Sequence, residues 1–177
     1  MSAWNRAGFA ALLVTMVASG FFVSSYLKGQ ASGAATNRGT QQRPEFTLND
    51  LQNKPRRVGE WNGKVLVVNF WATWCPPCRK EIPQFIALQQ EFEERGLQFL
   101  GIAIDDREAV REFAQSLRFN YPILVGEQDA VDVAIAYGNV IGALPYTVVV
   151  DRKGTIVLTH QGELSGHRLE QVIVRLI

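Results

Sequence analysis

The strongest constraint on the fold of this chain is a mostly apolar run placed just before a pair of cysteines. The run extends from Val65 to Trp71, is rich in valine and does not alternate with polar residues. Such a run is typical of a strand buried on both faces of a sheet. After the cysteines, apolar residues recur at helical spacing at Ile82, Phe85, Ile86 and Phe92. The cysteines are therefore predicted to lie where a buried strand ends and a helix begins.

The pair, Cys75 and Cys78, contains every cysteine of the chain, and two prolines separate them. Cysteines at this spacing either close a small disulfide ring or open to two thiols. A zinc site would need further ligands, and the only histidines, His160 and His167, lie far along the sequence. A purely structural disulfide is disfavoured, because closing so short a loop removes little entropy from the unfolded chain. We therefore predict a redox-active pair without a bound metal.

The predicted position at a helix start assigns different roles to the two thiols. Unpaired amides and the positive end of the helix dipole stabilise a thiolate, which is the form that attacks a disulfide. Cys75 is therefore predicted to be the nucleophile and Cys78, one turn into the helix, the resolving thiol. Pro76 and Pro77 suit a first helical turn but have no N–H to donate to the Cys75 sulfur. A moderately lowered pKa of the Cys75 thiol and a reducing or intermediate potential are expected.

The segment from Asn69 to Pro83 resembles the active-site segment of the TlpA/ResA group of membrane-tethered thioredoxin-like oxidoreductases. Later landmarks of that group recur in order and at similar spacing, namely Ala136-Tyr137-Gly138, Leu144-Pro145-Tyr146-Thr147 and Asp151-Arg152-Lys153-Gly154. The resemblance covers the chain from about Pro44 to its end. It implies an α/β thioredoxin-like fold, with a central mixed sheet flanked by helices, extra N-terminal strands and a central αβ insertion.

The resemblance also implies a role for Glu81, which matches a glutamate found just after the second cysteine in that group. Thioredoxins have a buried aspartate in the preceding strand, where this chain has Asn69, which cannot ionise. On a helix, Glu81 shares a face with Cys78. A carboxylate buried there would have a raised pKa and would move protons during exchange. The alternative is an ordinary first-turn acid favoured by the helix dipole.

Pro145 matches a proline that members of the group hold in the cis form, facing the disulfide. The implied role is to present the Leu144 backbone as an edge for the extended chain of a substrate. With Trp74 and Pro76, which flank Cys75, these two residues are the predicted substrate-binding residues. Tyr146 departs from the more usual threonine after this proline, and the sequence leaves the effect of this departure on the substrate groove open.

The N-terminal part of the chain differs in character from the rest. An uncharged apolar stretch from Ala7 to Leu27 is long enough to cross a bilayer, whereas the apolar core of a cleaved signal is usually shorter. Residues 1–28 are therefore predicted to be a single-pass anchor, with a cleaved signal peptide as the alternative. Residues 29–43 contain small and polar residues and are predicted to be a flexible linker. Residues 44–177 are predicted to be the thioredoxin-like domain.

Within that domain, capping and turn residues predict the order of the elements. Two short strands precede the central strand, the helix after the cysteines ends at Gly96, and Asp105 with Glu108 forms a capping box for the next helix. Ser165 is the predicted cap of the last helix. Further elements are expected at 98–104 (strand), 121–125 (strand), 129–137 (helix), and 147–150 with 155–159 (hairpin).

These observations favour thiol–disulfide exchange, with the Cys75–Cys78 disulfide in place of a cofactor. A near-neutral charge without basic runs excludes a nucleic-acid footprint. The resemblance implies a reductase of partner-protein disulfides, serving for example cytochrome c maturation and re-reduced by a membrane thiol donor. It also implies a bacterial inner-membrane anchor with the domain in the periplasm; with a cleaved signal, the domain would be a soluble periplasmic protein. The alternative functions are a disulfide oxidase or isomerase of the same fold, and a non-catalytic copper or other metal chaperone.

Overall fold

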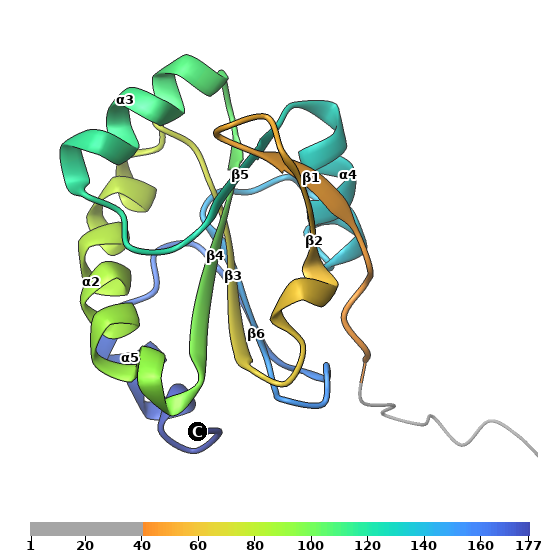
Figure 1. Ribbon diagram of the computed structural model, residues 1–177, viewed down its shortest axis with the longest axis vertical. Helices are drawn as coiled ribbons and strands as arrows, with labels where there is room; N and C mark the ends of the chain where they lie inside the picture. Colours follow the sequence, from red (N-terminus) through yellow and green to blue (C-terminus); the bar gives the residue numbers. More distant parts are fainter. Residues whose placement is uncertain (1–40) are drawn as a thin grey trace, which may run out of the picture. The chain divides into compact units, whose positions relative to one another are not determined.

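A seven-stranded mixed sheet runs through residues 41–177, the part of the chain that the computed structural model describes (Figure 1). Its order is β2-β1-β5-β4-β3-β6-β7, with β3, β4 and β5 parallel to one another and the other neighbours antiparallel. The strands are β1 (Thr47–Asp50), β2 (Pro55–Arg57), β3 (Val65–Trp71), β4 (Leu97–Ile104), β5 (Ile123–Gly126), β6 (Tyr146–Val150) and β7 (Ile156–Gln161). The predicted α/β fold with a central mixed sheet is confirmed.

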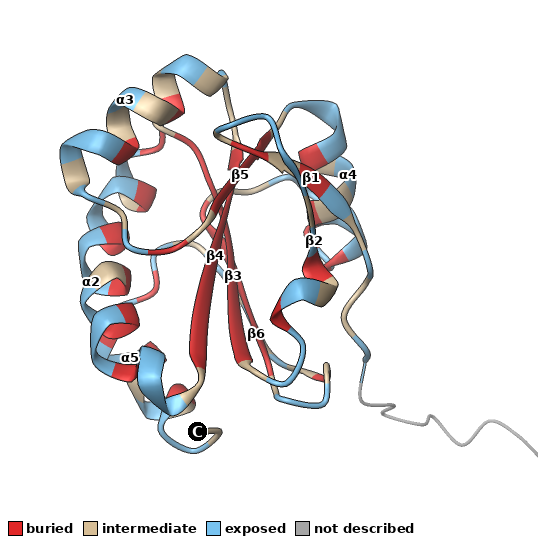
Figure 2. Ribbon diagram, viewed as in Figure 1, coloured by how far each residue is buried: buried red, intermediate tan, exposed pale blue. Residues whose placement is uncertain are grey.

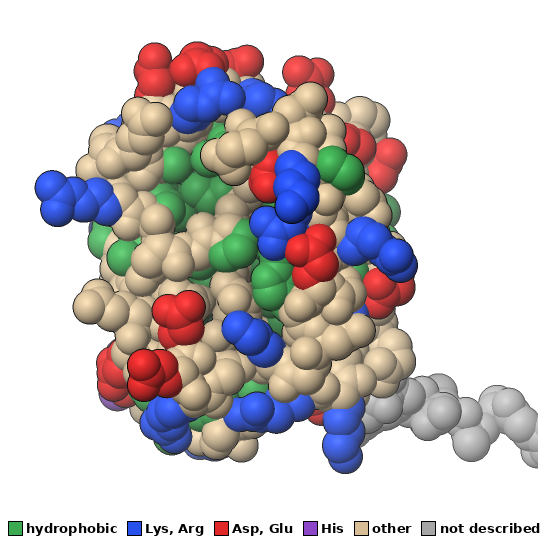
Figure 3. All heavy atoms as spheres, viewed as in Figure 1, with side chains coloured by type: hydrophobic (Ala, Val, Ile, Leu, Met, Phe, Trp, Pro, Cys, Tyr) green, Lys and Arg blue, Asp and Glu red, His purple; other side chains and the backbone are tan. Residues whose placement is uncertain are grey.

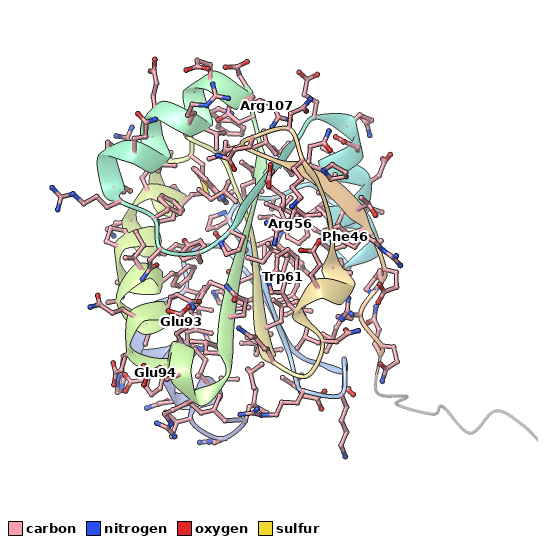
Figure 4. The ribbon with its side chains drawn as sticks, viewed as in Figure 1. Phe46, Arg56, Trp61, Glu93, Glu94 and Arg107 are labelled. Carbon is pink, nitrogen blue, oxygen red and sulfur yellow. A yellow bond between two sulfur atoms is a disulfide. The ribbon has the colours of Figure 1, made fainter. Side chains whose placement is uncertain are left out.

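Helices cover both faces of this sheet (Figure 1). One face packs against α2 (Pro76–Phe92), α3 (Arg107–Leu117) and α5 (Gly166–Ile173). The other face packs against the short 3-10 helix η1 (Val58–Trp61) and α4 (Gln128–Ala136). On this second face, Arg56 lies over the ring of Trp61, 5.3 Å from its centroid (Figure 4). The carboxyl ends of β3 and β4 meet the starts of α2 and α3 at the upper end of Figure 1.

Strand β3 is buried along its whole length, which explains why its sequence is apolar without alternation. Leu66, Val68 and Phe70 point into the core beneath α4, whereas Val65 and Val67 point toward α2 and α5. Figure 2 shows the same burial along β3 and β4 and on the inner faces of the helices. The predicted central strand is confirmed, and it places the cysteines at the end of the best-packed element of the sheet.

The predicted N-terminal strands and central insertion are both present. β1 and β2 form a hairpin that joins the sheet beside β5, while α3, β5 and α4 lie between β4 and β6 in the chain. The predicted linker boundary at residue 43 is too late, because Arg43 N donates to Gly154 O and Ile156 N donates to Gln41 O. The pairing partner of this segment is more than 100 residues away, so local composition could not show it.

The predicted anchor at 1–28, and the linker up to residue 40, lie outside the described residues. Within residues 41–177, no helix has both the length and the apolar character needed to cross a membrane. The predicted anchor therefore stays a prediction.

Two predicted helix ends need correction. The cap of α3 is Asp106, whose Oδ1 accepts hydrogen bonds from Glu108 N and Ala109 N, and the predicted cap by Asp105 is wrong. Asp105 instead accepts hydrogen bonds from Thr73, a contact between distant segments. Helix α2 ends at Phe92, and the 3-10 turn η2 (Glu93–Arg95) then leads to Gly96, whose φ of 92° suits glycine.

Ser165 is confirmed as the cap of α5, since its side chain accepts a 3.4 Å hydrogen bond from Arg168 N. We expect Ser165→Ala to lower the free energy of unfolding by about 1 kcal/mol, because a first-turn amide loses its acceptor. Urea unfolding measures the change. Ser116→Ala is the matched control, since this exposed serine near the end of α3 caps no helix start. An equal loss in both variants would contradict the assignment.

Candidate active site

The candidate active site is a disulfide at the carboxyl end of β3. Cys75 and Cys78 are bonded, with 2.06 Å between the sulfurs and 5.3 Å between the Cα atoms. Cys75 is the N-cap of α2, Pro76 and Pro77 occupy its first positions, and Cys78 N donates a 3.3 Å hydrogen bond to Cys75 Sγ. The structure thus confirms the predicted pairing and its place at a helix start.

Exposure distinguishes the two sulfurs. The residue Cys75 is 3% exposed, whereas Cys78 is completely buried. The neighbours of Cys75 are open to solvent, since Trp74 is 66% exposed and Pro76 is also exposed. Both cysteines are buried in the disulfide form, with Cys75 next to the exposed residues, and the order of attack stays a prediction.

A second segment, remote in sequence, completes the surface around the disulfide. The Leu144–Pro145 peptide bond is cis, as predicted, and Leu144 packs against the cluster that contains both cysteines. The pairing of β6 beside β3 brings this turn to the disulfide, because Tyr146 lies opposite Phe70 at the end of the ladder. Leu144 and Pro145 thus lie next to the site, as the substrate-binding prediction requires.

The loop before this proline contains two residues that the sequence analysis did not single out. Val140 and Ile141 are each 74% exposed, although both are large and apolar. Buried Asn139 closes the loop beneath them, since its Nδ2 donates to Ala143 O at 2.9 Å and its Oδ1 accepts from Ala143 N at 3.1 Å. The signal in the sequence is the pair of apolar residues between Asn139 and Gly142, where loops are usually polar.

Tyr146 does not face the predicted substrate groove. Its side chain is buried against Phe70, and its hydroxyl donates a 3.1 Å hydrogen bond to Tyr137 O. The departure from threonine at this position therefore changes the core beneath α4. The Tyr146 side chain packs in the core cluster beneath α4, whereas the two cysteines belong to a different cluster.

Glu81 lies in α2 one turn after Cys78 and is fully buried. Its Oε1 accepts a 2.8 Å hydrogen bond from Asn69 Nδ2, and its Oε2 accepts a 2.9 Å bond from Leu164 N. Burial raises the pKa of this carboxyl to about 7, because the two hydrogen bonds offset the loss of hydration only in part. The alternative of an ordinary solvated first-turn acid does not fit this burial.

Asn69 connects Glu81 to the next strand. Its Nδ2 also donates a 3.1 Å hydrogen bond to Thr147 Oγ1 in β6, so one amide group links β3, α2 and β6. The residue that stands in place of the usual aspartate is therefore a hydrogen-bond donor to the acid of the site. It holds the Glu81 side chain in position and carries no charge of its own.

Acidic side chains gather at the starts of two helices near this end of the sheet. Figure 3 shows red carboxylates at the upper end of the molecule, with blue Lys and Arg side chains beside them, and further Lys and Arg side chains along the lower edge. A cavity of about 340 Å³ at this acidic end is lined by carboxylates at the starts of the two helices, namely Asp105, Asp106, Glu127 and Asp129. Among residues 41–177, no three His, Cys, Asp or Glu side chains are grouped so that they could hold a metal ion.

Comparisons with known proteins agree with this geometry. The AhpC/TSA family model matches residues 40–159. The thiol-disulfide oxidoreductase ResA of Halalkalibacterium halodurans is 30% identical over 170 residues, which are 95% of this chain and 91% of the relative. ResA of Geobacillus thermodenitrificans is 28% identical over 161 residues, covering 90% of this chain and 88% of the relative.

Solved structures extend the comparison to the fold. A thiol:disulfide interchange protein from Chlorobium tepidum is 28% identical, with a TM-score of 0.70 over 77% of this chain and 95% of that chain. The thioredoxin domain of a thiol-disulfide oxidoreductase from Bacteroides vulgatus is 25% identical, with a TM-score of 0.68 over the same shares. With its disulfide at the start of α2, the chain therefore belongs to the AhpC/TSA family, among thioredoxin-like thiol-disulfide oxidoreductases of the ResA type.

Proposed function

We propose that this protein reduces disulfide bonds of partner proteins outside the cytoplasm. The observation that carries the proposal is a disulfide in which Cys75 caps a helix and lies between the exposed residues Trp74 and Pro76. In the dithiol form, the Cys75 thiolate attacks one sulfur of the substrate disulfide and releases the other as a thiolate. Cys78 then attacks Cys75 Sγ, which releases the second substrate sulfur and closes the Cys75–Cys78 bond. Two electrons pass to the substrate, whose two sulfurs end as thiols after protonation.

The environment of Cys75 supports the reducing direction. The start of α2 stabilises the thiolate through its dipole, but the two prolines remove donors that would otherwise approach the sulfur. The backbone N–H that reaches Cys75 Sγ in the described structure comes from Cys78. A thiolate with such limited stabilisation favours a potential lower than that of a strong oxidant, because a strongly stabilised reduced form is what makes an oxidant.

Glu81 supports the proton transfers of the cycle. With a pKa of about 7, this carboxyl exists in both protonation states near neutral pH. It shares a helix face with Cys78, which must lose a proton before it attacks the mixed disulfide. Glu81 accepts that proton in the proposed cycle, while Asn69 and Leu164 N hold the carboxylate in place.

The substrate binds as an extended segment across Trp74, Pro76, Leu144 and Pro145 in this proposal. Trp74 and Pro76 flank Cys75 and are exposed, and Leu144 packs against the cluster that contains both cysteines. The apolar stretch at 7–27 supports an inner-membrane anchor, with the domain in the periplasm and a membrane thiol donor that re-reduces the pair. Apocytochrome c is one substrate that suits this arrangement, and the resemblance to the TlpA/ResA group supports it.

Equilibration of the full-length protein with defined glutathione mixtures tests the proposal. We expect a potential nearer to about −270 mV than to about −120 mV, the values typical of a reducing and of a strongly oxidising thioredoxin-like protein. The reduced protein should also open an accessible protein disulfide faster than a small free thiol does. A potential near the oxidising value would support an oxidase and contradict a reductase.

A further inference from the structure

The loop between β3 and α2 is tied to the neighbouring strand by one carboxylate. The backbone ladder of β3 and β4 ends at the pair Trp71 and Ala103, and β4 continues for one more residue, Ile104, which pairs with Gly126 of β5. Beyond that point, Asp105 Oδ2 accepts a 2.8 Å hydrogen bond from Thr73 N and a 2.6 Å bond from Thr73 Oγ1. The second oxygen, Oδ1, accepts a 2.8 Å bond from Asp106 N. Asp105 therefore extends the contact between the two strands up to the cysteine loop.

Thr73 is the residue of this loop (72–75) that bonds to the segment after β4. Cys75 N donates a 3.2 Å hydrogen bond to Ala72 O within the loop, and Trp74 is largely exposed to solvent. Two bonds from Thr73 to Asp105 connect this loop to the segment after β4. On its other side the loop joins α2, because Cys78 N donates to Cys75 Sγ at 3.3 Å and Arg79 N donates to Cys75 O at 3.2 Å. The position of Cys75 depends on both sets of bonds.

The backbone segment that follows Asp105 is itself held by hydrogen bonds. Asp106 caps α3 through Glu108 N and Ala109 N, which anchors the helix start directly after Asp105. Arg107, labelled at the upper end of Figure 4, donates from Nη1 to Asp50 O in β1. Asp105 thus projects from a segment that is held to two other elements, and it can restrain the loop rather than follow it.

We infer that Asp105 is a positioning residue that keeps Cys75 at the start of α2 when the disulfide is open. In the oxidised protein the Cys75–Cys78 bond already holds the loop to α2. Reduction removes that covalent link and leaves the backbone bond from Arg79 N to Cys75 O together with the Thr73–Asp105 bonds, which restrain the loop from the side of β4. The inference rests on the proposed thiol–disulfide exchange, in which the reduced form is the one that reacts.

The restraint acts differently on the two redox states. The favourable field of a helix start falls off within the first turn, so a thiolate that moves away from it loses stabilisation. Without Asp105 the reduced form is destabilised more than the oxidised form, which shifts the equilibrium toward the disulfide. The pKa of the Cys75 thiol then rises. Loss of a nearby negative charge alone would lower that pKa, so the sign of the change separates positioning from simple electrostatics.

The test compares full-length wild-type protein with Asp105→Ala in glutathione mixtures. We expect the equilibrium constant to shift toward the disulfide by about tenfold, which corresponds to a potential about 30 mV more negative. The pKa of the Cys75 thiol, followed by the ultraviolet absorbance of the thiolate, should rise. Thr73→Val keeps the N–H bond but loses the hydroxyl bond, and should give a smaller shift of the same sign.

Two matched variants control for general damage to the fold. Asp105→Asn retains an oxygen that can accept from Thr73 and should restore most of the wild-type equilibrium. Asp106→Ala removes the neighbouring cap of α3 and should leave the equilibrium unchanged although the protein is less stable. A lowered thiol pKa in Asp105→Ala, an unchanged equilibrium, or an equal shift in Asp106→Ala would overturn the inference. If the wild-type pair does not equilibrate with glutathione at all, the proposed function fails instead.

Discussion

Cys75→Ser is expected to reduce disulfide exchange to the uncatalysed rate. A serine hydroxyl cannot form the mixed disulfide, and no other cysteine of the chain is available except buried Cys78. The measurement is the rate at which the reduced variant opens an accessible protein disulfide, compared with the wild-type protein at the same concentration. The loss should be complete for large protein substrates, because they cannot reach a sulfur that is fully enclosed.

Cys78→Ser provides the matched control for this loss. It retains the attacking thiol but cannot release the intermediate, so it should accumulate a mixed disulfide with its substrate. Mass spectrometry of the trapped species would also identify the partner protein. If Cys75→Ser traps substrate and Cys78→Ser does not, the assignment of nucleophile and resolving thiol is reversed.

Glu81→Gln is expected to slow exchange and, above neutral pH, to stabilise the fold. General acid–base groups typically contribute about 10²- to 10⁴-fold, so we expect the exchange rate at pH 7 to fall by about 10²-fold. Glutamine is similar in shape and can still accept from Leu164 N, but it cannot take a proton from Cys78. The rate should also lose its inflection near pH 7, which is where burial places the pKa of Glu81.

The effect on stability follows from the direction of the same pKa shift. The carboxyl has a pKa of 4.5 in its ordinary state and about 7 in the fold, so the folded protein binds the proton more tightly. The contribution of Glu81 to stability is full below pH 4.5, declines as pH rises toward 7, and stays lost above it. This difference corresponds to about 3 kcal/mol. Glu81→Gln should avoid that decline. The unfolding free energy of the variant minus that of the wild type should therefore increase between pH 5 and pH 8.

Urea unfolding of both proteins at the two pH values measures this gain, because other titrating groups cancel in the comparison. Glu94→Gln is the control, since Glu94 is an exposed acid of η2 at the far end of α2 (Figure 4). It should change neither the exchange rate nor the pH dependence of stability. A constant difference between Glu81→Gln and wild type across this range would contradict the raised pKa.

Several features of the site could be predicted from the residues because they depend on local pattern. The apolar run before the cysteines predicted a strand buried on both faces, and all of β3 is buried. The spacing of Cys75 and Cys78 and the prolines between them predicted a disulfide at a helix start, which α2 confirms. The cis bond before Pro145 followed from the resemblance and is also present.

Two of the errors share one physical cause, which is competition from a distant partner. Asp105 has the spacing of a helix cap, but Thr73, 32 residues earlier, binds its carboxylate and leaves the cap to Asp106. Arg43 has the composition of a linker, but Gly154 accepts a hydrogen bond from its backbone. Local sequence carries no record of such partners, since each residue type would be equally suited to the predicted role.

The sequence by itself determined which atoms form the disulfide, since only two cysteines exist and their spacing permits one small ring at the end of a buried strand. Only the tertiary structure decided the pKa of the neighbouring acid and the hydrogen bonds that hold the cysteine loop. Packing of distant segments buries Glu81 and raises its pKa, the hydrogen bond from Leu164 N, 83 residues away, offsets part of that rise, and Asp105 reaches the cysteine loop from the end of another strand. Burial and hydrogen bonding depend on which segments pack together, and that packing is a property of the whole fold.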